Sequence, residues 1–297
     1  MIFWEKLHKE ENDIGLTFSQ SKYRCEQIIT TKINEIPMSS VQLKTDYFVE
    51  RIMDNQNNMA FYFRVDDNIS TMFPAQYSKA MDMVNELEAI KCNVTLSVNP
   101  KSGEIERILD SDDVRLHWNS YKNELVNRYN FLRGNNAKEG LVKIVSTMDK
   151  LIASPDMHLE ELCNKIFYMT FFGKYLIGME DWKSPFEINF RSQLFSGVNT
   201  KIPITQEIDS ESQEFVVLSR RGEIPKSMRY NKEVMMLYDK NYKPSIQYKF
   251  TEYHAVYEAN IEINAEKNYL NKAYIFLSEE VVNNILFSVI CNIRKID

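Results

Sequence analysis

Apolar and polar residues alternate between positions 93 and 99, in the segment NVTLSVN. A period of two is typical of a strand that buries one of its faces. The Asn-Pro step that ends this run favours a type I turn, and Gly103 can adopt the left-handed conformation that returns the chain into a second strand at 105–109. A phosphate-binding loop would instead be expected at the start of a helix. The pattern therefore predicts a β-hairpin at 93–109.

The same alternation predicts strands in two further parts of the chain. Residues 41–49 and 59–65 alternate on either side of a polar segment, which indicates a second hairpin. Toward the C-terminus, alternating or short apolar runs predict strands at 186–190, 215–218, 246–250, 261–263 and 285–293. The last of these is the most regular run of period two in the chain.

Apolar residues recur at helical spacing in four segments, at 74–90, 114–125, 141–152 and 154–167. Asp112 and Asp113 precede the second segment and Arg133 follows it, an order of charges that complements the helix dipole. Ser154 and Pro155 suit the N-cap and the first turn of the fourth segment. Four helices are therefore predicted.

Together these elements predict an α+β protein in which antiparallel β-meanders flank a central helical block. We expect strands with one helix in residues 1–110, the helical block in 111–182 and further strands in 183–297, all in one composite domain. The two strand groups form one curved sheet or two packed sheets, because the βα alternation of a parallel sheet is missing. Such an architecture resembles that of half-barrel lipid carriers, but no motif assigns the sequence to a family.

Composition narrows the classes of partner. The 297 residues are 44% hydrophobic and 26% charged, with a net charge of −6, which argues against a nucleic-acid partner and is compatible with a basic protein. The N-terminal segment becomes charged by Glu5, unlike a secretory signal, and no run approaches the ~18 apolar residues of a membrane span. We therefore expect a cytoplasmic protein without a membrane span.

Cysteine and glycine usage excludes several kinds of site. The four cysteines are scattered, which predicts reduced thiols rather than disulfides or a zinc site; they are Cys25, Cys92, Cys163 and Cys291. None of the eight glycines forms Gly-x-Gly, which a dinucleotide fold requires. Gly173 and Gly178 have the spacing of a phosphate loop, but Met179-Glu180 stands where Lys and Ser or Thr are needed. GxSxG and HExxH are also absent, so the common nucleotide folds and two hydrolase classes are excluded.

Two groups of acidic and histidine residues could suggest metal binding. Asp110, with the two aspartates that follow it, could begin a calcium loop, but Arg115 stands where that loop needs a glycine. We interpret the aspartates as the N-terminus of a helix. His158 and Glu161 share a helical face near Cys163, but di-iron helices use the reverse order in two copies. No metal site is therefore assigned.

The remaining candidates are weaker. His8, His117 and His254 show no ligand spacing, and a Cys–His nucleophile pair stays possible without a residue that marks it. The segment 219–222, which contains Arg220 and Arg221, could bind a carboxylate or phosphate, but we interpret it as a polar turn at a strand end. The 16 tyrosines and 17 phenylalanines could line a ligand cavity, although their spacing favours core packing.

Three function classes remain open. The preferred one is a non-enzymatic module that binds one cognate protein, such as a toxin-neutralising immunity protein or a secretion chaperone or adaptor. The first alternative is a carrier of a hydrophobic small molecule in a cupped sheet. The second is an enzyme whose site the sequence does not reveal. We assign no catalytic, metal-binding or cofactor-binding residue and no cofactor, and the partner-binding surface and the oligomeric state stay open.

Overall fold

The fold was analysed in a computed structural model of the chain. The structure describes residues 19–53, 58–99, 102–129, 135–172, 185–212, 214–264 and 269–297. Within this part, the protein is an α+β fold built on one large antiparallel sheet, as the sequence predicts. None of the helices in these ranges combines the length and the apolar character that crossing a membrane requires.

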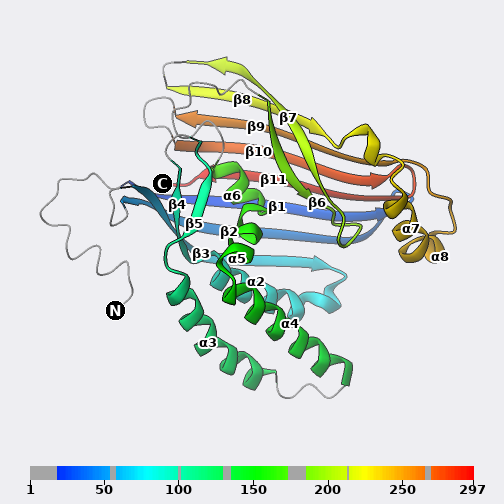
Figure 1. The fold of residues 1–297 in the computed structure, drawn as a ribbon, viewed down its shortest axis with the longest axis horizontal. Coiled ribbons are helices and arrows are strands. Elements are labelled where there is room, and N and C mark those ends of the chain that lie inside the picture. Colours follow the sequence, from blue (N-terminus) through cyan, green and yellow to red (C-terminus); the bar gives the residue numbers. More distant parts are fainter. Residues whose placement is uncertain are drawn as a thin grey trace, which may run out of the picture.

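One sheet contains all eleven strands of the described residues, and neighbouring strands are antiparallel (Figure 1). Its order is β5-β4-β3-β2-β1-β11-β10-β9-β8-β7-β6. The bounds are β1 Gln20–Ile33, β2 Ile36–Met53, β3 Met59–Phe73, β4 Val94–Val98, β5 Ile105–Ile108, β6 Phe186–Arg191, β7 Asn199–Glu211, β8 Phe215–Glu223, β9 Tyr253–Asn264, β10 Tyr269–Val281 and β11 Ile285–Lys295. Because β1 pairs with β11, the two predicted strand groups join in the middle of one sheet. The alternative of two packed sheets is therefore not observed.

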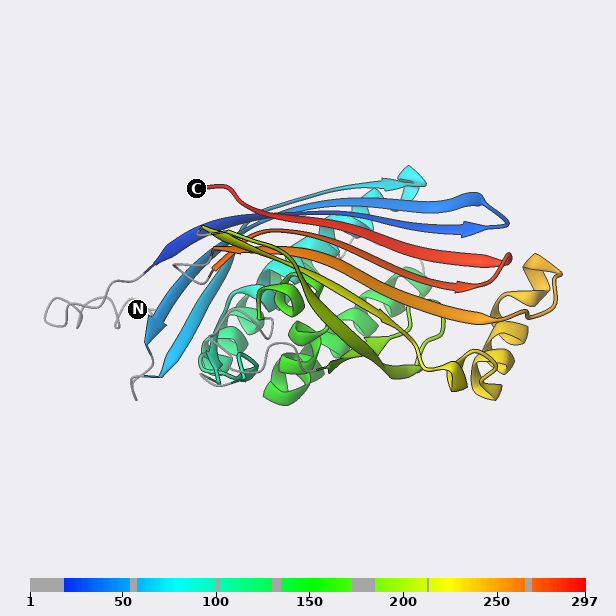
Figure 2. The same ribbon diagram turned by 90° about the horizontal axis from the view of Figure 1, so that it is seen from above.

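The sheet is bowed, and the helices α2 to α6 lie on its concave side (Figure 2). The helices are α2 Ser78–Cys92, α3 Ser111–Arg128, α4 Asn135–Ala153, α5 Pro155–Cys163, α6 Ile166–Phe171, α7 Lys232–Asn241 and α8 Lys243–Ile246, with short 3₁₀ turns at Ala75–Tyr77 and Lys226–Met228. The helices α7 and α8 lie at one end of the sheet (Figure 1). Helices α7 and α8 thus lie outside both 111–182 and the helix predicted at 74–90, and the central helical block is not confirmed.

The core lies between the concave face and helix α6. The ring of Phe167 stacks on Tyr47 of β2 with centroids 3.9 Å apart, and Phe171 meets Tyr23 of β1 edge-on at 5.5 Å. Tyr168 packs against Phe63 of β3 at 5.0 Å. Each such aromatic pair contributes about 0.5–1.5 kcal/mol beyond the burial of its area. These contacts anchor a helix of only six residues on the middle of the sheet.

The predicted hairpin at 93–109 is confirmed. Strands β4 and β5 pair antiparallel, and Gly103 has a φ of 73°, the left-handed conformation that a glycine adopts without strain. The Gly103 amide donates to the Asn99 carbonyl at 2.9 Å, which closes the turn. Pro100 and Lys101 lie outside the described residues.

Other predictions are confirmed in part. The helix predicted at 74–90 begins at Ser78 after a 3₁₀ turn, and the aspartates at 112 and 113 occupy the first turn of α3. The predicted end of that helix, at Arg133, lies outside the described residues. The side chain of Ser154 caps α5 by accepting from the Met157 amide at 3.3 Å, as the sequence indicates.

Two predicted elements are wrong. The segment 154–167 is not one helix, because α5 ends at Cys163 and Lys165 is extended before α6 begins. The alternation at 246–250 is not a strand: Ile246 ends helix α8 and Gln247 is left-handed, with a φ of 63°. Burial of Ile246 explains the misleading apolar position. Strands β1, β7 and β10 and helix α7 were not predicted.

Candidate ligand-binding site

Three adjoining cavities lie between the concave face of the sheet and the helices beneath it. The first, which we call the α2 cavity, has a volume of about 500 Å³ and lies between α2, α6 and the strands β1–β3, β10 and β11. The bridging cavity, of about 310 Å³, lies beside α6 and β6. The Arg220 cavity, of about 450 Å³, lies between α6, the strands β6, β8 and β9, and the start of β5.

Neighbouring cavities share parts of their walls. Met169, Ile188 and Tyr257 line both the Arg220 cavity and the bridging cavity. Ile166 and Leu277 line both the bridging cavity and the α2 cavity. The three therefore follow one another beneath the sheet. The extended residue Lys165 contributes to this space, because it separates α5 from α6 and lines two of the cavities.

The walls of the α2 cavity are mostly apolar. Because side chains alternate between the faces of a strand, every second residue of the strands points toward the helices. The apolar side chains that line this cavity include Ile29, Val41, Leu43, Val65, Met81, Val84, Ile166, Phe167, Leu277, Phe287 and Val289. Gln27 and Thr45 are the polar exceptions on β1 and β2.

A cluster of charges stands where the α2 cavity meets the bridging cavity. Glu88 of α2 forms ion pairs with Lys165 and Lys91, and Lys91 also lies 3.4 Å from Glu161. Although burial opposes the charged form, the two lysines hold the pKa of Glu88 below its usual value. Burial also opposes the charge of Lys165, but Cys92 and Glu88 together raise its pKa. The cluster therefore stays charged and compensates itself internally.

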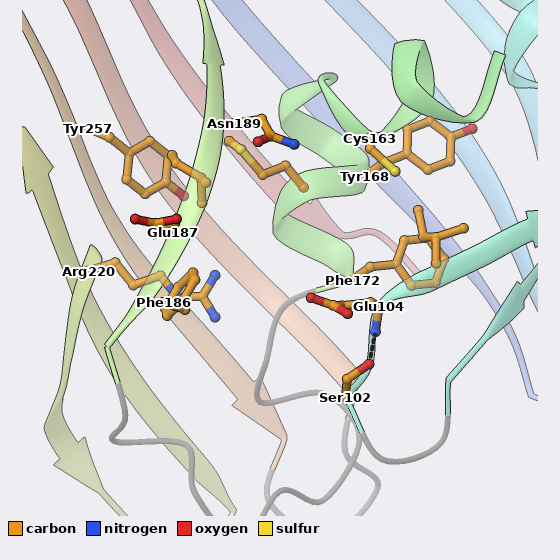
Figure 3. A pocket seen from close by; sticks show the side chains of 13 residues that line it. Ser102, Glu104, Cys163, Tyr168, Phe172, Phe186, Glu187, Asn189, Arg220 and Tyr257 are labelled. Atoms are coloured by element: carbon orange, nitrogen blue, oxygen red, sulfur yellow. Dashed lines mark hydrogen bonds between the residues drawn. The ribbon is translucent and has the colours of Figure 1, made fainter. Parts of the chain in front are cut away.

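The Arg220 cavity combines apolar and aromatic walls with one buried cation (Figure 3). Tyr168 comes from α6 and Phe172 directly follows this helix, whereas Phe186 comes from β6 and Tyr257 from β9. Arg220 lies near Phe186 in Figure 3, across the cavity from the α6 side chains. The polar residues Ser102, Glu104, Glu187 and Asn189 complete the lining.

The strand register explains why Arg220 is buried. It lies in the middle of β8, opposite Gln206 of β7 and Ala259 of β9, on the face that also carries Val216 and Leu218. Only 3% of its surface is exposed. Our interpretation of the segment 219–222 as a turn is therefore wrong, because the pairing of β8 on both sides keeps it in the sheet.

The guanidinium of Arg220 is held by neutral groups. Its Nε donates to Oε1 of Gln206 at 2.7 Å, it hydrogen-bonds to the Tyr257 side chain, and it lies 5.3 Å from the centroid of the Phe186 ring. Burial lowers the pKa of Arg220, while Tyr257 opposes this shift. An arginine stays protonated even so. Among the described residues, no carboxylate forms an ion pair with it.

The neighbouring arginine provides a contrast. Arg221 points to the opposite face of β8, where 75% of its side chain is exposed and its Nε lies 3.8 Å from Glu258. The sequence places two identical residues side by side, and the alternation of the strand separates their environments. The signal that could have identified Arg220 is its place in the register of Val216 and Leu218.

The other residues considered in the sequence do not converge on one site. His158 is buried, with Nε2 2.8 Å from the Lys91 carbonyl, and burial lowers its pKa. Glu161 contacts Lys91 and Arg191 instead of the histidine. Cys163 lines the Arg220 cavity, where burial raises its pKa to about 11, so its thiol is a poor nucleophile at neutral pH.

The aspartates at 110, 112 and 113 also have separate roles. The carboxylate of Asp110 accepts from the amide and the hydroxyl of Thr95, at 2.9 and 2.7 Å, and so ties α3 to β4. Asp112 pairs with Arg115 on the exposed side of α3. In the described ranges, no group of three or more His, Cys, Asp or Glu side chains is arranged to hold a metal ion.

Comparison with known proteins gives little further information. No known protein family and no curated protein matches the sequence. A solved structure described as lipid–protein interactions in lipovitellin superposes with a TM-score of 0.40 at 8% sequence identity. The match covers 94% of this chain and 25% of that one, so the chain spans about a quarter of its length. A similarity this weak does not assign a family.

Proposed function

We propose that the protein binds a small apolar or amphipathic molecule beneath its bowed sheet and acts as a carrier of it. The observation that supports this proposal is the run of three adjoining cavities between the concave face and the helices. Each has a volume in the range of about 300–1,000 Å³ that is usual for small-molecule sites. The largely apolar walls of the α2 cavity and the Arg220 cavity favour an apolar ligand, and the bridging cavity between them is lined by polar and apolar residues alike.

Packing supports the same proposal. Protein interiors pack about as densely as organic crystals, and few voids in them exceed a water molecule. The α2 cavity, of about 500 Å³, is partly open and far larger than such a void, and it lies against the aromatic core around α6. Burying an apolar ligand there would stabilise the complex by about 25 cal/mol for each Å² removed from water.

Filling the shared wall tests this proposal. Leu277 of β10 lines both the α2 cavity and the bridging cavity, so Leu277→Trp places an indole where the ligand would lie. The control is Phe276→Trp, because residue 276 points to the convex face of the same strand. Titration with the neutral fluorescent probe N-phenyl-1-naphthylamine should show one saturable site in the wild type and in the control. The affinity for the probe should be at least about tenfold lower in Leu277→Trp than in the wild type.

Two results of this titration would contradict the proposal. Equal binding by the wild type and Leu277→Trp, or no saturable binding by the wild type, would exclude a ligand in these cavities. Circular dichroism and thermal melting of the two tryptophan variants control for a change in the fold.

A module that binds one cognate protein is the second candidate, with an immunity protein or a secretion chaperone or adaptor as examples. The observation that favours it is a set of exposed apolar side chains where β2 begins, where β3 ends and in the 3₁₀ turn that follows β3. They are Ile36, Met38, Phe73 and Tyr77, each at least half exposed. Exposed apolar groups of this kind often mark a protein interface. The net charge of −6 favours a basic partner.

This candidate makes a different prediction. A one-to-one complex with a cognate protein should be lost in Phe73→Glu and should persist in Ile296→Glu, which changes an exposed apolar side chain near the C-terminus. Its association should slow as the salt concentration rises if the partner is basic. A complex that resists Phe73→Glu would exclude this surface.

A further inference from the structure

We infer that the Arg220 cavity receives the oxyanion head, a carboxylate or a phosphate, of an amphipathic ligand whose apolar chain lies against the aromatic walls. This inference rests on the proposed function, because it names the class of ligand that the cavities would hold. It depends on Arg220, whose segment could bind a carboxylate or phosphate on sequence grounds but was interpreted as a polar turn.

The hydrogen bonding of Arg220 leaves donors for such a head group. A guanidinium has five N–H donors in a planar fork, and it binds carboxylates and phosphates through two parallel hydrogen bonds. Gln206 accepts from Nε, and Tyr257 provides the other side-chain hydrogen bond among the described residues. These two hydrogen bonds leave other N–H donors of the guanidinium, and the residue lines the open volume of the cavity.

The charge of Arg220 lacks a counter-charge from the described part of the chain. The two glutamates of the same cavity do not supply one: Glu187 is 54% exposed and lies 3.1 Å from Lys201, and Glu104 is exposed at the turn that leads into β5. Neither is among the groups that shift the pKa of Arg220, which are its burial and Tyr257. A buried charge without a partner is costly, and a bound oxyanion would compensate it.

The shape of the cavity provides for an apolar chain. Tyr168, Phe172 and Phe186 form aromatic walls around the space into which Arg220 opens (Figure 3). Met169 and Ile188 continue this wall into the bridging cavity. A head group at Arg220 would therefore have apolar side chains beside it for its chain, along the concave face toward the bridging cavity.

Binding of matched C12 ligands tests this inference. Dodecanoate and dodecyl phosphate carry the two oxyanion heads, dodecanol is their neutral counterpart, and acetate and inorganic phosphate are the heads without a chain. We expect the wild type to bind at least one of the two anionic ligands at least about tenfold more tightly than dodecanol, because hydrogen bonds to charged groups are the stronger kind. The comparison of the two anionic ligands shows which head the site prefers.

Three variants assign the effect to Arg220. Arg220→Gln should lower the affinity for the preferred anionic ligand at least about tenfold and leave that for dodecanol within about twofold. Arg221→Gln removes the exposed neighbour and should change neither affinity. Arg220→Lys keeps the charge but loses the fork, so its affinity for the anion should lie between those of the wild type and Arg220→Gln. This variant replaces Arg220→Gln in the comparison if the latter does not fold.

Each remaining outcome overturns a distinct claim. If dodecanol binds as tightly as the anionic ligands and Arg220→Gln changes nothing, the inference is wrong and the carrier proposal stands. If acetate or inorganic phosphate binds as tightly as its C12 derivative, the site takes a free anion and not an amphiphile. If no C12 ligand binds, the carrier proposal fails together with the inference.

Discussion

Glu279 fixes the loop after β6 to the concave face, and its removal should destabilise the protein strongly. Its side chain is fully buried and accepts hydrogen bonds from four donors: the hydroxyls of Ser192 and Tyr253 and the amides of Gln193 and Leu194. The amide bonds measure 2.7 and 3.2 Å and the tyrosine bond 2.8 Å. Because all four partners donate, the carboxylate is suited to its ionised form, in which it only accepts.

The size of the effect follows from these contacts. Glu279→Ala leaves four buried donors without their acceptor, and each unsatisfied group costs about 1–3 kcal/mol. The variant also loses the buried carboxylate itself. Burial imposes a desolvation cost on this group, which raises the pKa of Glu279, and the variant no longer bears that cost. These contributions oppose each other, so we expect a net loss of about 3–5 kcal/mol in the free energy of unfolding.

Urea unfolding followed by circular dichroism measures this loss at neutral pH. Glu280→Ala is the matched control, since residue 280 follows on the same strand and points to the convex face. We expect the control to change the free energy of unfolding by less than about 0.5 kcal/mol. A loss below about 1 kcal/mol in Glu279→Ala, with the slope of the urea dependence unchanged, would refute the assigned role of the carboxylate.

Three further predictions concern stability and the thiols. Gly103→Val should lower the free energy of unfolding by at least about 1 kcal/mol, because a β-branched residue resists a φ of 73°. Gly140→Ala should raise it, because the position lies in helix α4 and has open space for a methyl group. Thermal melts that show equal effects for the two variants would contradict this. Burial raises the pKa of Asp110 to about 6, so its contribution to stability is present below pH 4 and is lost as the pH rises through 6. The free energy of unfolding of the wild type should therefore fall by about 2 kcal/mol between pH 4 and 7, and that of Asp110→Asn should not show this fall. Identical pH profiles of the wild type and the variant would contradict this. Thiol titration of the denatured chain should give four free groups even though the sulfurs of Cys25 and Cys291 lie 3.5 Å apart, and two groups would mean that this pair is oxidised.

Local signals made part of the fold predictable. The hairpin at 93–109 follows from short-range chemistry, because the alternation, the turn residues and the glycine all lie within the hairpin itself. The cap of α5 at Ser154 follows in the same way. The break at Lys165 could not be predicted, since apolar residues continue on both sides of it and only their packing against the sheet separates α5 from α6.

Other features depend on contacts between distant parts of the chain. Strand β1 carries Gln27 toward the α2 cavity, which interrupts its apolar face and hides the alternation. Its pairing with β11 joins residues more than 250 positions apart, and no local pattern encodes that contact. Arg220 was misinterpreted for the same reason: its burial arises from β7 and β9 on either side, not from its neighbours in sequence.

Native mass spectrometry of the full chain mixed with equimolar dodecanoate, dodecyl phosphate and dodecanol tests the carrier proposal most directly. The account predicts one bound C12 molecule per wild-type chain, and a clear loss of this species in Leu277→Trp but not in Phe276→Trp. The absence of a one-to-one complex in the wild type, or the same amount of complex in Leu277→Trp, would contradict it.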